Sequence, residues 1–242
     1  QMGVFTLVTV TQEIAYLLCL NWFSVYALRF LPAPQDTAGL HRYLRTENVV
    51  VLASVLGGIV VSLLTVASLP ATSDPMLAAA AVAGYIVTRS TTAHYAERAR
   101  AQSAFLAYSL LQLSGPAGGL LLGLAALQVL PGDAWVLLSA YAVAQAVGVL
   151  AAWPLMGMQA SVRAPDRQLL TAAARFGAPL VGLGILGWIA ENYIRYLVQW
   201  QEGAAVLGLM IVGWALGRRC AAVASMLITT AAFPLASRAL NE

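Results

Sequence analysis

Long apolar runs alternate with short polar breaks along the whole chain. Seven runs are long enough to be membrane-spanning helices, because about 20 consecutive apolar residues cross the hydrocarbon core. We predict an all-α, polytopic membrane protein, with one helical bundle and the start of a second around a central cavity. The seven predicted spans are 3–27, 49–69, 76–92, 103–130, 134–155, 178–199 and 204–235.

Turn-forming residues separate these runs. Proline-containing breaks lie at 31–34, 69–75 and 130–133. Pro116 falls inside the fourth run, where it predicts a kink. Gly115, Gly119 and Gly123 in the same run let neighbouring helix backbones approach closely.

The arginines favour one orientation in the membrane. The second, fourth and sixth connections carry no arginine, whereas the first, third and fifth carry three each, and Arg238 follows the last span. Because cytoplasmic loops are rich in cations, the arginine-bearing connections are predicted to lie in the cytoplasm. Those nine arginines are Arg29, Arg42 and Arg45; Arg89, Arg98 and Arg100; and Arg163, Arg167 and Arg175.

This orientation makes the first span run from outside to inside, with no signal peptide before it. We therefore expect at least one span to precede Gln1, so that the chain is an internal piece of a larger protein. The predicted parts are a first bundle over 1–155 that lacks its first helix, a cytoplasmic linker over 156–175, and the start of a second bundle over 176–242. A helix lying on the membrane surface is an alternative for the linker.

Composition excludes several other classes of protein. Of 242 residues, 60% are apolar and 10% are charged, which excludes a soluble globular domain, a nucleic-acid-binding module and a disordered tail. All 13 cationic residues are arginine, so chemistry that needs a lysine is excluded. Cys19 and Cys220 lie in apolar runs, and neither His41 nor His94 has a second metal ligand at useful spacing. We expect no disulfide framework, no metal site and no cofactor.

Charged residues inside the spans are the candidates for function, because a charge in the bilayer core costs about 2.5–3.5 kcal/mol on insertion scales. Arg195, Arg218 and Arg219 are predicted to line the cavity and bind an anion, since arginine keeps its charge and binds phosphate bidentately. Glu13 and Glu191 are predicted coupling or ion-pair acids.

Structural roles are alternatives for each of these residues. Glu191 and Arg195 stand four residues apart on one helix face and suit an internal ion pair, and Arg195 is also placed to reach the outer headgroups. Arg218 and Arg219 point about 100° apart on a helix, so one is expected to line the cavity and the other to pair or snorkel. No enzyme signature is evident, neither an intramembrane pair of aspartates nor a serine with a buried histidine.

Short motifs, taken in order, resemble the polysaccharide-transporter branch of the multidrug/oligosaccharidyl-lipid/polysaccharide exporter superfamily, which includes the O-antigen flippases. The resemblance covers the second to the eighth span of that family. The motifs are Gly3–Val8, Arg29–Pro32, Arg98–Gln102 with Tyr108, Phe176–Leu180, Arg195–Leu197 with Gly203 and 206–208, and Phe233–Leu235.

The resemblance implies two six-helix bundles in the bacterial inner membrane. It implies alternating-access export of an oligosaccharide carried on undecaprenyl pyrophosphate, with cavity cations on the pyrophosphate and, in some members, coupling to protons or sodium ions. Membrane lipids and the glycan polymerase or ligase machinery are the implied partners. The family often has an acid directly before the span-seven arginine, whereas Ile194 stands here and Glu191 lies one turn earlier.

Three other functions stay open at the level of the sequence. The first is export of another substrate of the same superfamily, a drug or a peptidoglycan precursor. The second is a membrane-embedded glycan polymerase or ligase. The third is a membrane scaffold without transport activity.

Overall fold

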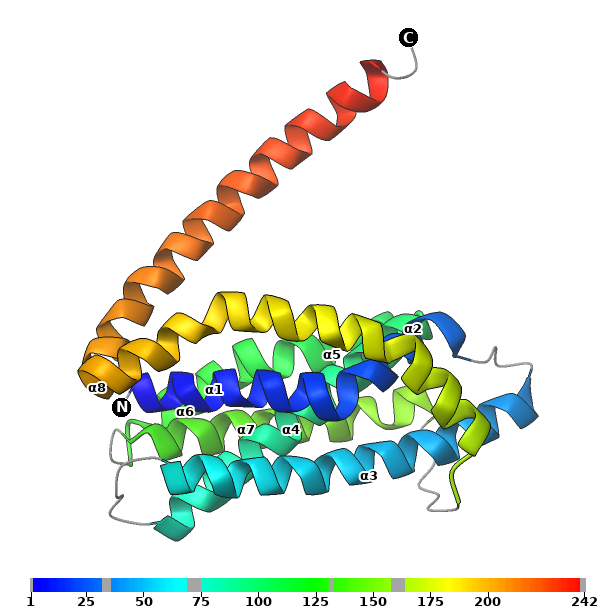
Figure 1. Cartoon of the computed structure of the whole chain (residues 1–242), viewed down its shortest axis with the longest axis horizontal. Helices are drawn as coiled ribbons and strands as arrows, with labels where there is room; N and C mark the ends of the chain where they lie inside the picture. Colours follow the sequence, from blue (N-terminus) through cyan, green and yellow to red (C-terminus); the bar gives the residue numbers. More distant parts are fainter. Residues whose placement is uncertain (1, 32–35, 69–74, 131–132, 158–163, 240–242) are drawn as a thin grey trace.

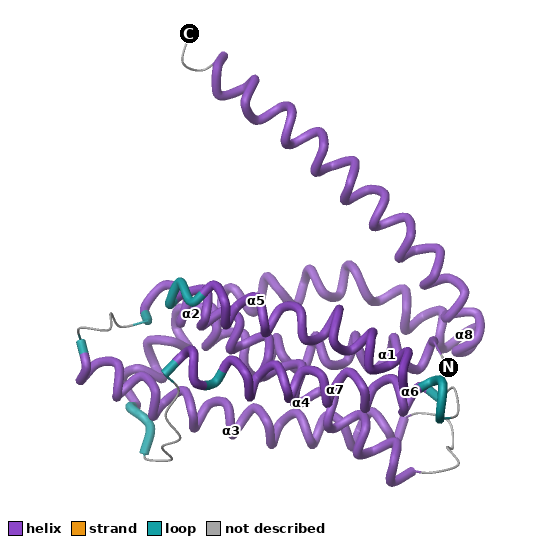
Figure 2. Tube along the Cα trace, turned by 180° about the vertical axis from the view of Figure 1, so that it is seen from behind, coloured by secondary structure: helices purple, strands orange, loops and turns teal. Residues whose placement is uncertain are grey.

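A computed structural model describes residues 2–31, 36–68, 75–130, 133–157 and 164–239. Within the last range, the side chains of residues 204, 218–219 and 222–239 lie outside the described part. Every regular element in these ranges is a helix (Figure 2). The predicted all-α fold is confirmed.

Each of the seven apolar runs forms helix, in the predicted order. The first run forms α1 (Met2–Tyr16), the π-helix η1 (Leu17–Asn21) and α2 (Trp22–Phe30), which continue one another. The second and third form α3 (Thr37–Ser68) and α4 (Pro75–Ala101). The fourth forms α5 (Phe105–Leu113), the π-helix η2 (Ser114–Gly119) and α6 (Leu120–Ala126), and the fifth forms α7 (Ala134–Ala152), followed by the short 3-10 helix η3 (Pro154–Met156). The last two form one long helix, α8 (Arg167–Ala239).

α4 is the central helix of the bundle. It packs against α1, α2, α3, α5 and α7, and small side chains such as Ala78, Ala81 and Ala99 are buried along it. Figure 1 shows α4 running between α3 on one side and α1 on the other. Polar residues on α4 are therefore shielded by neighbouring helices rather than by lipid.

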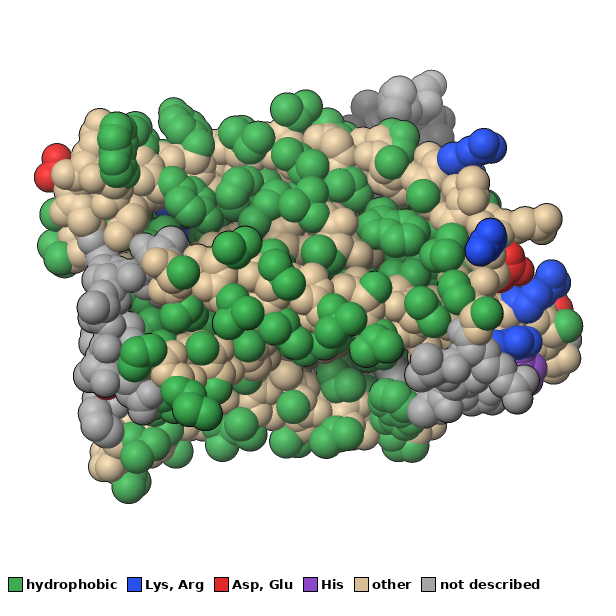
Figure 3. All heavy atoms as spheres, turned by 60° about the horizontal axis from the view of Figure 1, so that its bottom comes forward, with side chains coloured by type: hydrophobic (Ala, Val, Ile, Leu, Met, Phe, Trp, Pro, Cys, Tyr) green, Lys and Arg blue, Asp and Glu red, His purple; other side chains and the backbone are tan. Residues whose placement is uncertain are grey.

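The surface of the bundle suits a membrane. Five helical stretches are long and apolar enough to cross one: Gly3–Phe30, Thr37–Ala67, Phe105–Ala126, Ala134–Ala152 and Arg167–Gly203. Large apolar side chains are exposed on their flanks, among them Leu56, Leu64 and Leu150. Figure 3 shows apolar side chains spread over one flank, with the visible cationic side chains gathered at one end. The chain is a multi-pass membrane protein.

Glycine contacts hold the fourth run against α7. A side chain on Gly119 would come within 2.6 Å of the Tyr141 ring, and one on Gly123 within 3.1 Å of Leu137. The expected close approach of these glycines is thus observed. Pro116, at which the sequence predicts a kink, lies within the π-helix η2.

Two predicted boundaries were wrong. Helix α3 begins at Thr37 and α4 ends at Ala101, so both extend well past the predicted ends of their spans, 49 and 92. Their extra turns are polar on one face, but they pack against protein and need no lipid-facing apolar surface. Arg89 was counted with the third connection although it falls inside the predicted span 76–92, and it lies in the middle of α4.

Helix α8 has two halves that meet at Gly203. The first half lies along α1 and α2, while the second half stands away from the bundle (Figure 1). Gly203 has φ 81° and ψ 176°, a backbone conformation that is nearly exclusive to glycine. The helix begins inside the predicted linker, where the Asp166 carboxylate accepts hydrogen bonds from the backbone N–H groups of Gln168 and Leu169 at 2.8 and 3.2 Å.

Candidate functional site

Arg89 is a half-buried arginine at mid-depth in the bundle. Two residues close to Arg89 indicate its depth in the bundle. Gly115 lies halfway along the stretch Phe105–Ala126, and Gln145 lies near the middle of α7. A side chain on Gly115 would be 3.8 Å from the Arg89 Nη1 atom and 3.1 Å from the Gln145 Nε2 atom. A cation at this depth needs a partner or a hydrated space.

A polar cavity of about 380 Å³ supplies that space. It lies between the α1–η1–α2 segment, α4 and α5, and it falls within the size range of ligand pockets. Along α4 the lining extends from Arg89 to Arg100, about 16 Å at 1.5 Å per residue. The polar side chains of the lining are Tyr16, Asn21, Arg89, Thr92, Glu97, Arg100 and Gln112.

The charges of the lining add up to a positive site. Arg100 and Glu97 form an ion pair on α4, with 3.3 Å between the Arg100 Nη2 and Glu97 Oε2 atoms. Arg89 therefore supplies a charge that this pair does not balance. The Thr92 hydroxyl, 1% exposed, has no hydrogen-bond partner among the described residues. An arginine on the wall of a polar cavity suits a phosphate or another small anionic group.

Two of the residues predicted from the sequence, Glu13 and Arg195, belong to helices that pack against each other, α1 and α8. The hydroxyl groups of Thr11 and Tyr196 lie 3.3 Å apart across this interface, two residues from Glu13 and one from Arg195. Arg195 is half-buried, and Glu191 is exposed one turn earlier on α8.

Glu13 also lies near the cavity arginine. The Tyr85 hydroxyl on α4 feels the charges of both Arg89 and Glu13. The neighbouring pair Gln12 and Ser90 joins α1 to α4, with 3.2 Å between the Gln12 Nε2 and Ser90 Oγ atoms. Glu13 follows directly after Gln12 and therefore lies close to this contact between α1 and α4.

The remaining candidates, Arg218 and Arg219, are not tested by the structure. Their backbone belongs to the second half of α8, beyond Gly203, and their side chains lie outside the described residues. Their assignment to the cavity stays a prediction.

Sequence reasoning missed a second polar cluster, at the end of the bundle that carries Arg29, Arg42, Arg45 and Arg100, which we name the arginine-rich end. Ser24 of α2 lies 2.8 Å from the His94 Nδ1 atom of α4, so the expectation of no serine beside a buried histidine was wrong. His94 and Arg98, four residues apart, both contact Glu47 of α3. The spacing of His94 and Arg98 on one helix face was the only signal in the sequence, because Glu47 lies on another helix.

These clusters do not provide a metal centre. Within the ranges that the structure describes, no three His, Cys, Asp or Glu side chains come close enough to hold a metal ion.

Comparison with known proteins adds nothing to this picture. No protein-family model, curated protein or solved structure matches the chain. The functional assignment therefore depends on the Arg89 cavity and on the short motifs described above.

Proposed function

We propose that this protein is an exporter that moves a lipid-linked oligosaccharide, carried on undecaprenyl pyrophosphate, from the inner to the outer leaflet of the bacterial inner membrane. The observation that supports it most is the half-buried Arg89 on the wall of a polar cavity at mid-depth. A structural arginine at this depth would be expected to pair with an acid, and the acid nearest in the cavity lining, Glu97, already contacts Arg100.

The cavity suits a headgroup that enters from the cytoplasm. It extends from Arg100, at the arginine-rich end, to Arg89 at mid-depth. The positive-inside rule assigns the arginine-rich end to the cytoplasm. A pyrophosphate could thus move from one arginine to the other while its lipid tail stays in the bilayer, and Arg195 would meet it farther towards the outside.

Replacement of Arg89 tests this proposal in a deletion strain of the native host that carries the gene for the whole protein. Arg89→Gln should lower surface glycan export by about tenfold or more, because a hydrogen bond to a charged group contributes about 1.5–3 kcal/mol. Lipid-linked repeat units should accumulate on the cytoplasmic leaflet. Arg42→Gln, at an exposed arginine of α3, is the matched control and should export normally.

Two outcomes would contradict the proposal. Normal export by Arg89→Gln at normal protein level would remove the cavity from the transport path. Repeat units that accumulate on the outer leaflet of the deletion strain would move the defect past translocation and favour the polymerase or ligase.

Arg195→Ala is a second test, at the residue that the sequence singled out. We expect it to abolish export without loss of protein, because Arg195 is a half-buried cation on the helix that packs against α1. Quantitative immunoblotting of the membrane fraction separates loss of transport from loss of protein. Unchanged export would remove Arg195 from the substrate path.

A further inference from the structure

Five side chains form a buried polar cluster between α2, α3 and α4, which we name the Glu47 cluster. Its members are Ser24, Tyr43, Glu47, His94 and Arg98, and none is more than 2% exposed. The Glu47 carboxylate contacts three of them. Arg98 Nη1 lies 2.6 Å from Oε2, whereas His94 Nε2 and the Tyr43 hydroxyl lie 3.0 and 3.3 Å from Oε1.

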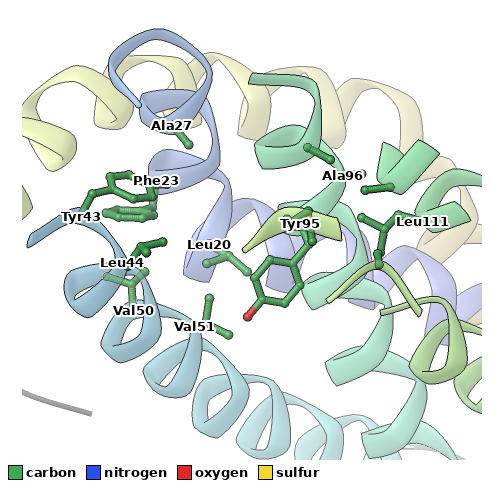
Figure 4. Close-up of a cluster of buried hydrophobic side chains, with 14 of the residues drawn as sticks. Leu20, Phe23, Ala27, Tyr43, Leu44, Val50, Val51, Tyr95, Ala96 and Leu111 are labelled. Carbon is green, nitrogen blue, oxygen red and sulfur yellow. The ribbon is translucent and has the colours of Figure 1, made fainter. Parts of the chain in front are cut away.

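Apolar and aromatic side chains surround this cluster. The rings of Phe23 and Tyr43 stack with centroids 5.5 Å apart, and the Phe23 centroid lies 6.1 Å from that of His94. Figure 4 shows Phe23 and Tyr43 face to face where α2 meets α3, with Tyr95 projecting from α4 nearby. Of the other two Arg98 nitrogens, Nη2 donates to the Met156 carbonyl oxygen at 3.2 Å, whereas Nε has no hydrogen-bond partner among the described residues. The Glu47 cluster therefore ties α2, α3, α4 and the end of η3 together.

His94 can exist in two protonation states within the same contacts. The Ser24 hydroxyl has one proton but two acceptors in reach, the Leu20 carbonyl oxygen at 3.1 Å and His94 Nδ1 at 2.8 Å. When His94 is neutral and carries its proton on Nε2, Ser24 donates to Nδ1. When His94 is protonated, its Nδ1–H donates to Ser24, whose own proton turns to Leu20.

The two states differ in net charge. With neutral His94, the charges of Glu47 and Arg98 cancel. Protonation of His94 leaves a net charge of one at a site where the histidine is 0% exposed. The ionisable groups around the Glu47 cluster include the phenols Tyr16, Tyr26 and Tyr95, and the charges of Glu97 and Arg89 act on Tyr16. The phenols supply no counter-charge while they keep their protons, and the charges of Glu97 and Arg89 are opposite in sign. Because an unbalanced buried charge is costly, protonation favours a state in which water reaches the cluster.

The same helices build the wall of the cavity. Ser24 of α2 belongs to the Glu47 cluster, while Val25 and Leu28 line the cavity. On α4, His94 lies between the lining residues Ala93 and Ala96. Separation of α2, α3 and α4 at the Glu47 cluster must therefore change the cavity at the arginine-rich end.

We propose that His94 is a proton-binding site, and that its protonation opens the arginine-rich end of the bundle. The ligand is a proton, taken up on the imidazole without any covalent step. In the exporter proposed above, and resting on that proposal, this site would make access to the cavity depend on proton uptake.

Selective isotope labelling of histidine tests proton binding directly, in the full chain reconstituted in lipid nanodiscs. The chain has 2 histidines, and the exposed His41 serves as the internal reference. Nitrogen chemical shifts should show His94 as the neutral Nε2–H tautomer at high pH and as imidazolium at low pH. A His94 signal that stays in one protonation state at every pH at which the protein remains folded would overturn the proposal.

Thiol labelling tests the opening. With Cys220→Ser, the half-buried Cys19 is the only thiol, and its carbonyl oxygen accepts a hydrogen bond from Ser54 of α3 at 2.8 Å. Maleimide labelling of Cys19, corrected for the thiolate fraction measured in unfolded protein, should accelerate several-fold as pH falls. His94→Gln should abolish this acceleration, whereas His41→Gln should keep it. An equal acceleration in both variants would overturn the proposal.

Glu47→Gln separates the proton site from a merely structural histidine. It removes the carboxylate that accepts from His94 Nε2, so the pH at which His94 takes up its proton should shift relative to that of His41. No shift would contradict the assigned contact. The two proposals can fail separately. If His94 binds a proton while Arg89→Gln exports normally, the proton site stands and the proposed transport path fails. If His94 never binds a proton, only the proton site is overturned.

Discussion

The two proposals depend on the surroundings of Arg89 and of Glu47, and neither was a predicted site residue. Arg89 was counted with a connection because the apolar run weakens near it, yet α4 continues through the protein interior. Glu47 and Arg98 are 51 residues apart, so no local pattern predicts their contact. Local patterns singled out Glu13 and Arg195, since each is a charge within an apolar run, and their roles stay predictions.

Removal of Glu47 should be strongly destabilising. Glu47→Ala leaves Arg98 buried without its carboxylate, and loss of one partner of a buried pair costs about 3–5 kcal/mol. We expect a clear fall in the midpoint of unfolding in a titration with denaturing detergent. Glu97→Ala, which breaks the partly exposed pair with Arg100, is the control and should cost about 1 kcal/mol or less. Equal effects would mean that Glu47 is not effectively buried.

At the level of elements, the sequence predicted which segments are helices better than where they end. All seven apolar runs are helical, because burial in lipid requires internal backbone hydrogen bonds. The added turns of α3 and α4 were missed, since their polar faces resemble loops when only hydropathy is considered. The start of α8 has a local cause that the sequence does contain, namely Asp166 as an N-cap.

Gly177 sets the distance between α8 and α2. A side chain there would come within 2.5 Å of the Trp22 carbonyl oxygen, and a backbone atom cannot yield as a flexible side chain can. Gly177→Leu should therefore push α8 from α2 and destabilise the protein by about 1–3 kcal/mol. Gly182→Leu, on the same helix and facing open space, is the matched control.

The measurement for this pair is the same detergent titration, combined with protease sensitivity of the chain near the start of α8. We expect faster cleavage only in Gly177→Leu. If both variants behave alike, helix propensity and not the contact with Trp22 determines the effect.

For the whole molecule, the distribution of arginine predicts how the bundle is oriented in the membrane, and the structure shows which positions can test this orientation. The ends of α2 and α4 and the starts of α3 and α8 meet at the arginine-rich end, with Arg29, Arg42, Arg100 and Arg167 at or near them. Figure 3 shows cationic side chains gathered at one end of the visible flank. If this end lies in the cytoplasm, all four of these helix ends lie there together, so one measurement of orientation tests them all.

Accessibility of two introduced cysteines tests that orientation. In a background with Cys19→Ser and Cys220→Ser, we compare Thr171→Cys at the start of α8 with Gln201→Cys near Gly203, both at exposed positions. A membrane-impermeant maleimide added to intact cells should label Gln201→Cys. It should label Thr171→Cys only after the membrane is opened. The reverse pattern would invert the predicted topology.

The backbone conformation of Gly203 sets the direction of the whole second half of α8. Helix α8 continues from Gly203 to Ala239, about 54 Å at 1.5 Å per residue. A rotation of about 10° at this point would displace the far end by about 9 Å on that length. A small torsional change at a single glycine is thus amplified into a movement as large as the spacing between packed helices.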